Sequence, residues 1–274
     1  MRALRALGET VAGRLPRAAR WALACLPGLL AMAALVLCVL GVQDAAGGGG
    51  RHTEARAAVA HRAVRPAIVP RERWLGDPRP TTPPAHYSGP VVVVFVHHTD
   101  SPNGYDCADA PRIIRALAEG QTSARLFDDI GYNFLVDRCG TIYEGRGGGV
   151  DKAVVGAHTQ GFNHRSAGVA ALGTFTAGSP VPAPMAEAIA ALAAWKLGLA
   201  GTDPRQTARL VSSNSLSRVP AGRHADFHAV AGHTDGYTTD CPGAALRAEL
   251  PAIRERAAVL QGRTPGRTTV ARGH

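Results

Sequence analysis

Three side chains in this 274-residue chain have the chemistry of metal ligands. His233 and Cys241 stand eight residues apart in segment 232–243, whose Gly, Thr and Asp content favours a loop over regular secondary structure. His97 follows the apolar run 91–96, which is typical of a buried strand. An imidazole nitrogen and a thiolate are donors that zinc prefers. The eight-residue spacing is not that of a zinc finger, and it favours three protein ligands with an open fourth position.

Each of these residues also has an ordinary interpretation. A single histidine at a strand end is more often a surface or core residue, and Cys241 alone could be a half-cystine or a buried thiol. A thiol hydrolase, with Cys241 as nucleophile and His233 as its base, is a second possible chemistry. Asp240 precedes the cysteine, and a neighbouring anion disfavours the thiolate, so the sequence favours metal binding.

A zinc ion with an open position is suited to amide hydrolysis, and that reaction needs a donor to the tetrahedral oxyanion. Tyr132, at the start of a predicted strand, and Thr239, two residues before Cys241, are the candidate catalytic donors. Their alternatives are an ordinary strand aromatic and a loop hydroxyl.

The charge of the chain is concentrated at its N-terminal end. The formal net charge is +9, of which residues 1–73 carry 11 − 4 = +7 and the remainder 19 − 17 = +2. Because the excess is in the flank, we do not expect the folded part to bind nucleic acid. The hydrophobic content of 46% is sufficient for a core.

The N-terminal region predicts export. A basic flank, 1–20, precedes the uncharged apolar segment 21–42, which is long enough to span a bilayer. An uncleaved membrane anchor is slightly favoured over a cleaved signal peptide, and either would place the rest of the chain in the extracytoplasmic cell envelope, anchored or secreted. Segment 43–67 has the composition of a flexible linker, and the tail 262–274 has no core-forming pattern, so we expect it to be disordered.

Three cysteines lie outside the apolar segment: Cys107, Cys139 and Cys241. An odd number in an exported protein needs an explanation. If Cys107 and Cys139 form a disulfide and Cys241 binds metal, no thiol is left idle.

The periodicity of residues 68–261 predicts one α/β domain. Strands are expected at 91–96, 130–136, 141–146 and 166–175, with weaker ones at 207–218 and 227–230. The second and third are expected to form an antiparallel hairpin through 137–140, and the fourth to be central. Helices are expected at 107–120, capped by Asp106 and stopped by Gly120; at 184–197, with one apolar stripe; and at 246–260, bent or restarted at Pro251.

From residue 68 to about 260 the chain resembles the peptidoglycan recognition protein family and the related zinc N-acetylmuramoyl-L-alanine amidases. The pieces that carry the resemblance lie in order along the chain, at 70–74, 96–99, 129–134, 140–146, 156–159, 173–175 and 232–243. Departures occur at 119–121, Phe127, Phe162 and Thr234, and they affect the expected fit of substrate more than the metal centre.

The resemblance implies a mixed central β-sheet flanked by helices and a groove for muropeptide. It implies Zn²⁺ held by His97, His233 and Cys241, with Tyr132 and Thr239 as catalytic residues. It also implies a disulfide between Cys107 and Cys139. The substrate-binding residues that it implies are His98, Thr99, His158 and Asn163.

The expected function is zinc-dependent hydrolysis of the amide between N-acetylmuramoyl and L-alanine in peptidoglycan. The alternative is a non-catalytic module that binds muropeptides. Loss of the cysteine ligand is the usual mark of that branch, whereas Cys241 is present. A weaker third hypothesis is a surface adhesin whose zinc is structural.

Overall fold

The computed structural model describes residues 61–77 and 81–264. The predicted basic flank, the apolar segment 21–42, most of the linker and most of the tail lie outside these residues. Among the described helices none has both the length and the apolar character needed to cross a bilayer.

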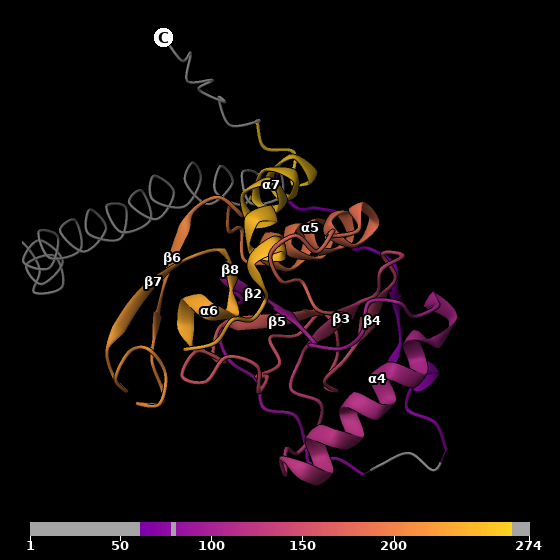
Figure 1. Cartoon of the computed structure of the whole chain (residues 1–274). Coiled ribbons are helices and arrows are strands. Elements are labelled where there is room, and N and C mark those ends of the chain that lie inside the picture. The colour runs from indigo at the N-terminus through magenta and orange to yellow at the C-terminus, as the bar shows by residue number, and fades with distance from the viewer. Residues whose placement is uncertain (1–60, 78–80, 265–274) are drawn as a thin grey trace, which may run out of the picture. The chain divides into compact units, whose positions relative to one another are not determined.

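A six-stranded sheet forms the centre of the described domain (Figure 1). Its strands, in spatial order, are β1 (Ile68–Val69), β4 (Ile142–Glu144), β3 (Phe134–Val136), β5 (Ser166–Ala171), β2 (Val93–His98) and β8 (Val230–Gly232). Only the β3–β4 pair is antiparallel, so the predicted hairpin and the mixed sheet are confirmed. β5 lies between β3 and β2, which confirms its central position. The inner strands are apolar throughout because helices or loops cover both of their faces.

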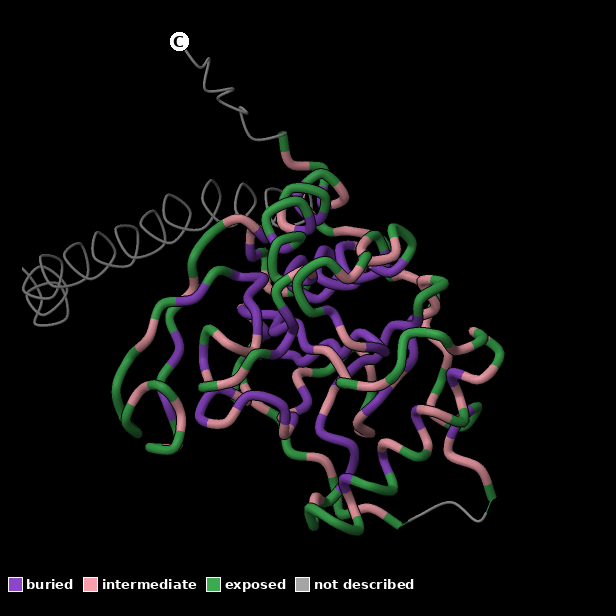
Figure 2. Tube along the Cα trace, in the orientation of Figure 1, coloured by how far each residue is buried: buried purple, intermediate pink, exposed green. Residues whose placement is uncertain are grey.

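Two helices cover one face of the sheet, α5 (Ala183–Gly198) and α7 (Ala244–Leu260) (Figure 1). The prediction of a single apolar stripe on α5 is wrong, because the helix is buried on most sides between the sheet and α7. α7 forms one helix with Pro251 inside it, and the predicted restart is absent. Figure 2 shows this buried layer in purple.

The opposite face is covered in part by α4 (Ala110–Glu119), which follows the short turn η2 (Cys107–Asp109). Asp106 caps this start as predicted, because its side chain accepts a hydrogen bond from the Ala108 N–H at 2.9 Å. Gly120 does not stop the helix, which continues as the π-helical turn η3 (Gly120–Ala124). The continuation buries Gln121, whose Oε1 accepts the Gly131 N–H at 2.8 Å.

A two-stranded antiparallel ribbon lies beside β8, formed by β6 (Thr207–Val211) and β7 (His224–His228) (Figure 1). The predicted strand 207–218 is therefore too long, since the chain turns back through loop 212–223. Much of the ribbon is exposed, as its green tube shows in Figure 2. Phe227 faces inward and contacts Phe95 and Phe162 in edge-on geometry.

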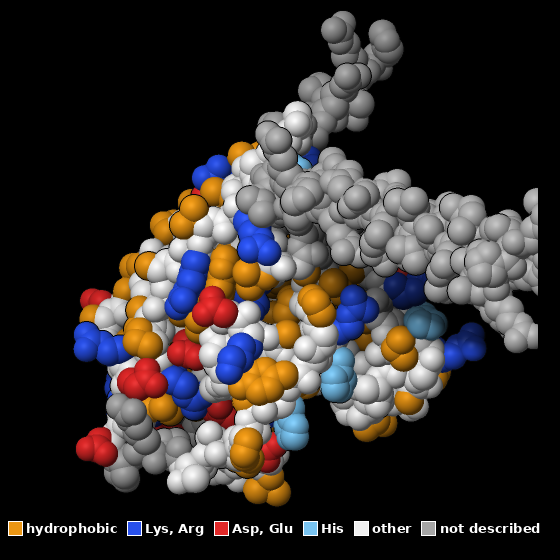
Figure 3. Space-filling model, turned by 180° about the vertical axis from the view of Figure 1, so that it is seen from behind, with side chains coloured by type: hydrophobic (Ala, Val, Ile, Leu, Met, Phe, Trp, Pro, Cys, Tyr) orange, Lys and Arg blue, Asp and Glu red, His pale blue; other side chains and the backbone are white. Residues whose placement is uncertain are grey.

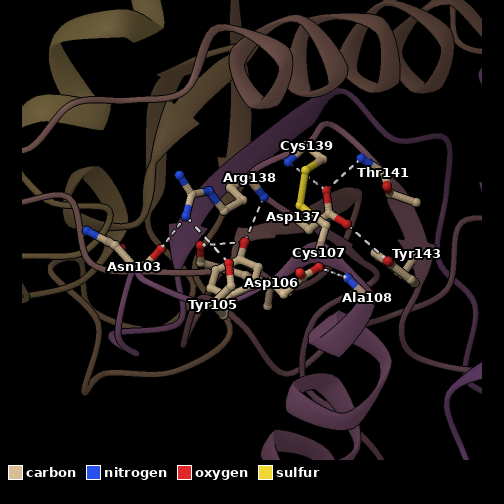
Figure 4. Close-up of a disulfide and its surroundings, with 11 residues drawn as sticks. Asn103, Tyr105, Asp106, Cys107, Ala108, Asp137, Arg138, Cys139, Thr141 and Tyr143 are labelled. Atoms are coloured by element: carbon tan, nitrogen blue, oxygen red, sulfur yellow. Dashed lines mark hydrogen bonds between the residues drawn. A yellow bond between two sulfur atoms is a disulfide. The ribbon is translucent and has the colours of Figure 1, made fainter.

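The predicted disulfide between Cys107 and Cys139 is present (Figure 4). It joins the start of α4 to the turn between β3 and β4. The buried Asp137 carboxylate stabilises that turn by accepting hydrogen bonds from the N–H groups of Cys139 and Thr141, at 2.9 and 2.8 Å. Among the described cysteines, Cys241 is the free one.

Acidic and basic side chains are interspersed on the face of the domain seen in Figure 3. This mixed pattern agrees with the small net charge that the sequence assigns to the residues beyond the N-terminal flank.

Candidate metal centre

The register of two parallel strands brings two of the predicted ligands together. Val96 of β2 pairs with Gly232 of β8, so that the next residues along each strand are His97 and His233. Their ring centroids are 4.4 Å apart. Side chains alternate along a strand, and His97 therefore points to the same face as Phe95, away from α5 and α7. His233 begins α6 (His233–Gly236), a short helix within the segment that was expected to be irregular.

The third predicted ligand returns to the same point from the loop after α6. The Thr234 N–H donates to the Cys241 carbonyl oxygen at 2.9 Å and ties the loop to the helix. The Cys241 Sγ lies 3.7 Å from His97 Nδ1 and accepts the His98 backbone N–H at 3.3 Å. One donor atom from each of His97, His233 and Cys241 lies within 4.8 Å of the other two. The structure therefore brings the three residues together.

The second nitrogen of His97 has its own polar contacts. Its Nε2 lies 3.3 Å from His158 Nδ1 and 3.4 Å from Thr159 Oγ1, and the last two atoms are 3.0 Å apart. Outer contacts of this kind fix the orientation of a metal-binding imidazole. His158 fits beside the sheet because Gly168 of β5 lies under its ring, where a Cβ would collide with the ring carbons. Thr159 was missed from the sequence, although it directly follows a predicted site residue.

Burial dominates the electrostatics of the cluster. It lowers the pKa of His233 to about 4 and that of His158 to about 3, and it holds the pKa of His97 well below its usual value. Burial also raises the pKa of the Cys241 thiol to about 12, and the His98 N–H offsets this only in part. Neutral imidazoles are ready to bind a cation, and a bound cation stabilises the thiolate. The donor set fits zinc, whereas a thiol nucleophile would need an activating positive group.

Both predicted catalytic residues lie beside these donors. The Tyr132 ring centroid is 5.2 Å from that of His97. Burial raises the pKa of Tyr132 to about 12, so its phenol keeps its proton and can donate a hydrogen bond. Thr239 Oγ1 accepts the Cys241 N–H at 3.2 Å and holds the turn before the thiol.

A buried ion pair positions the backbone before Tyr132. Arg71 donates two hydrogen bonds to the Asp129 carboxylate, Nη1 to Oδ2 at 2.7 Å and Nη2 to Oδ1 at 3.1 Å. Gly131 is fixed by Gln121 on one side and by the Ala157 N–H, which donates to the Gly131 carbonyl oxygen at 2.9 Å. Sequence reasoning did not find this network, because its members share no local spacing.

The four predicted substrate residues occupy different surroundings. His98 lines a cavity of about 250 Å³ together with Thr239, and His158 is buried against His97. Thr99 and Asn163 are engaged within loops. Thr99 Oγ1 accepts the Gly173 N–H at 3.0 Å, and Asn163 Oδ1 accepts the N–H groups of His158 and Thr159. Substrate contact by these four residues stays a prediction.

Comparison with known proteins identifies relatives for most of the domain. The family model described as N-acetylmuramoyl-L-alanine amidase matches residues 87–244, more than half of the chain. The human protein named N-acetylmuramoyl-L-alanine amidase is 34% identical over 184 residues, which are 66% of this chain and 27% of the human protein. A short peptidoglycan-recognition protein of Drosophila melanogaster is 34% identical over 186 residues, which are 67% of this chain and 85% of that protein. This chain therefore spans about a quarter of the human relative and most of the insect one.

Solved structures show the same fold. Drosophila PGRP-LB is 25% identical with a TM-score of 0.52, and the match covers 68% of this chain and 93% of that one. Human PGRP-IβC, solved in complex with glycosamyl muramyl pentapeptide, is 27% identical with a TM-score of 0.51, covering 67% of this chain and 93% of the other. Family model, relatives and fold agree: this chain belongs to the peptidoglycan recognition protein family, which shares the N-acetylmuramoyl-L-alanine amidase domain.

Proposed function

We propose that the protein is a zinc-dependent N-acetylmuramoyl-L-alanine amidase, which hydrolyses the amide between the lactyl group of muramic acid and L-alanine. The observation that carries this proposal is the convergence of donor atoms from His97, His233 and Cys241 within 4.8 Å, with the thiol free of any disulfide. Two imidazoles and one thiolate leave a tetrahedral ion one open position, as in hydrolytic zinc sites. Membership of the amidase family supports the same reaction.

When bound, zinc would polarise the scissile carbonyl and lower the pKa of water. The protein supplies the remaining parts. His97 is held by the contacts of its Nε2 to His158 and Thr159, which leaves Nδ1 directed toward Cys241. The protonated phenol of Tyr132 can donate to the amide oxygen as negative charge develops on it.

The test is digestion of purified peptidoglycan by the full chain, followed by labelling of newly exposed L-alanine amino groups. We expect release by the zinc-loaded protein, none after chelation, and recovery when zinc is returned. Cys241→Ser should abolish release, and Tyr132→Phe should reduce the turnover number by about 10²- to 10³-fold, as for loss of one oxyanion donor. Tyr87→Phe is the matched control, because that exposed hydroxyl donates to the Gly148 carbonyl oxygen. Full activity in the chelated sample would contradict the proposal.

A non-catalytic muropeptide-binding module is the second candidate. It is favoured by a solved neighbour, human PGRP-IβC, whose structure holds a glycosamyl muramyl pentapeptide. Retained binding of the wild type to peptidoglycan with no release of L-alanine amino groups, whether or not zinc is added, would select this function.

The site of action that we propose is outside the cytoplasm. The disulfide between Cys107 and Cys139 supports this location, because such bonds persist in oxidising compartments. Fractionation of cells that produce the full chain, with and without residues 1–42, tests whether that segment carries the export signal. Equal export without it would contradict this assignment.

A further inference from the structure

The loop between β6 and β7 contacts a segment that supports the metal centre. Ser213 of this loop donates its backbone N–H and its hydroxyl to the Gly161 carbonyl oxygen, at 2.8 and 3.3 Å. The two chains approach so closely that a Cβ on Gly161, which has φ +88°, would lie 2.7 Å from Ser217. Loop 212–223 is therefore fixed against segment 158–163, whose His158 contacts His97.

The same loop binds the C-terminal end of α6 through one residue, Arg218. Its backbone N–H donates to the Gly236 carbonyl oxygen at 3.1 Å. Its Nε donates to the carbonyl oxygens of Thr234 and Tyr237, at 2.7 and 3.0 Å. The last carbonyl groups of a helix have no partner within it, and an arginine side chain can supply one. A single residue thus binds three carbonyl groups at this helix end.

The N-terminal end of α6 is bound to the metal centre itself. The Gly232 N–H donates to the Asp235 carboxylate at 2.9 Å, and the Thr234 N–H donates to the Cys241 carbonyl oxygen at 2.9 Å. α6 is a four-residue helix that begins at His233, and a helix of that length is not stable by itself. Its position therefore depends on contacts at both ends, and Arg218 supplies those at the far end.

We propose that Arg218 is a positioning residue for His233, through which loop 212–223 sets the metal affinity of the centre. This inference rests on the proposed metal binding by His97, His233 and Cys241. Without the guanidinium, the carbonyl groups of Thr234 and Tyr237 lose their partner, and α6 can turn away from the orientation that aims His233 at the other donors. We expect Arg218→Ala to lower zinc affinity about 10- to 100-fold, the range for loss of an outer contact to a metal ligand.

The experiment measures zinc affinity of the full-length protein by competition with a chelator of known affinity, together with the rate of zinc release. Arg218→Lys should recover only part of the affinity, because an ammonium does not reproduce the planar guanidinium donor. Arg223→Ala is the matched control in the same loop, since that exposed side chain forms no hydrogen bond or ion pair with another described residue. Ile189→Val, in the buried α5 helix, controls for a general loss of stability.

The result that supports the proposal is weaker zinc binding by Arg218→Ala, with wild-type affinity in both control variants. Unchanged affinity in Arg218→Ala, while the wild type binds zinc, would overturn the positioning role and leave the metal site intact. An equal loss of affinity in Ile189→Val would also overturn it, because the effect would then follow stability alone. Failure of the wild type to bind zinc would instead overturn the proposed function, and this inference with it.

Discussion

The Arg71–Asp129 ion pair should contribute far more to stability than a surface pair. Both side chains are nearly buried, with 11% and 10% of their areas exposed, and the shorter of their two contacts is 2.7 Å. The carboxylate also accepts the N–H groups of Ile130 and Gly147, at 2.8 and 2.9 Å. The pair joins the start of the domain to the segment that leads into Tyr132.

Removing one partner leaves the other without compensation. Arg71→Met keeps much of the side-chain volume but leaves the Asp129 carboxylate with two backbone donors. Breaking a buried pair in this way costs about 3–5 kcal/mol, out of a total stability of about 5–15 kcal/mol for a typical domain. Asp129→Asn should cost a similar amount, because an amide donor then faces a guanidinium or a backbone N–H. The double variant removes the unpaired charge, and we expect its loss to fall short of the sum by about 2–3 kcal/mol.

Denaturant unfolding of the metal-free full-length protein, followed by tryptophan fluorescence, measures the three free energies. Trp74 reports directly on this region, because the Arg71 guanidinium lies 5.5 Å from its ring centroid. A coupling below about 1 kcal/mol, the range for exposed pairs, would refute the reasoning. Activity gives a second measurement, since a displaced Tyr132 should lower kcat more than it raises KM.

The pH dependence of this pair has a defined sign. Burial opposes ionisation of Asp129, but the hydrogen bonds from Arg71 and Gly147 outweigh it and hold the pKa below its usual value of 3.8. The unfolded chain therefore takes up a proton first as the pH falls. The stabilisation is present above pH 3.8 and is lost as the pH falls through the depressed value. The coupling measured at neutral pH should shrink in strong acid.

The glycine under His158, the disulfide and the buried histidines each give a further measurable expectation. Gly168→Ala forces a Cβ into the His158 ring and should lower zinc content after dialysis, whereas Gly120→Ala, with open space around it, should not. Replacing Cys107 and Cys139 with alanine should lower the free energy of unfolding by about 4 kcal/mol, from the 32-residue separation of the cysteines. In the metal-free protein the depressed pKa of His233 means that the unfolded state binds more protons between pH 6.5 and about 4. Stability should therefore fall with falling pH by about 1.4 kcal/mol per pH unit for each such histidine. A flat profile from neutral pH down to about pH 5 would contradict this expectation.

The sequence determined the local features of this protein. The apolar run at 91–96 predicts a buried strand because only a strand covered on both faces is apolar throughout. The odd number of cysteines outside the apolar segment anticipates one disulfide and one free thiol, and both are present. The donor types and the ordered motifs indicated the family, because the chemistry of a site depends on which residue types are available.

The tertiary structure decided which residues meet. His97 and Cys241 are 144 residues apart, and it is the pairing of Val96 with Gly232, followed by the return of the loop after α6, that brings their side chains together. Arg71 and Arg218 were not recognised as supports of the site, because an ion pair or a bound helix end leaves no periodic signal in either partner. α5 is buried on most sides for the same reason, since the layer that covers it, α7, is a separate segment. Periodicity reports the environment of one segment, whereas a site is made by the register and packing between segments.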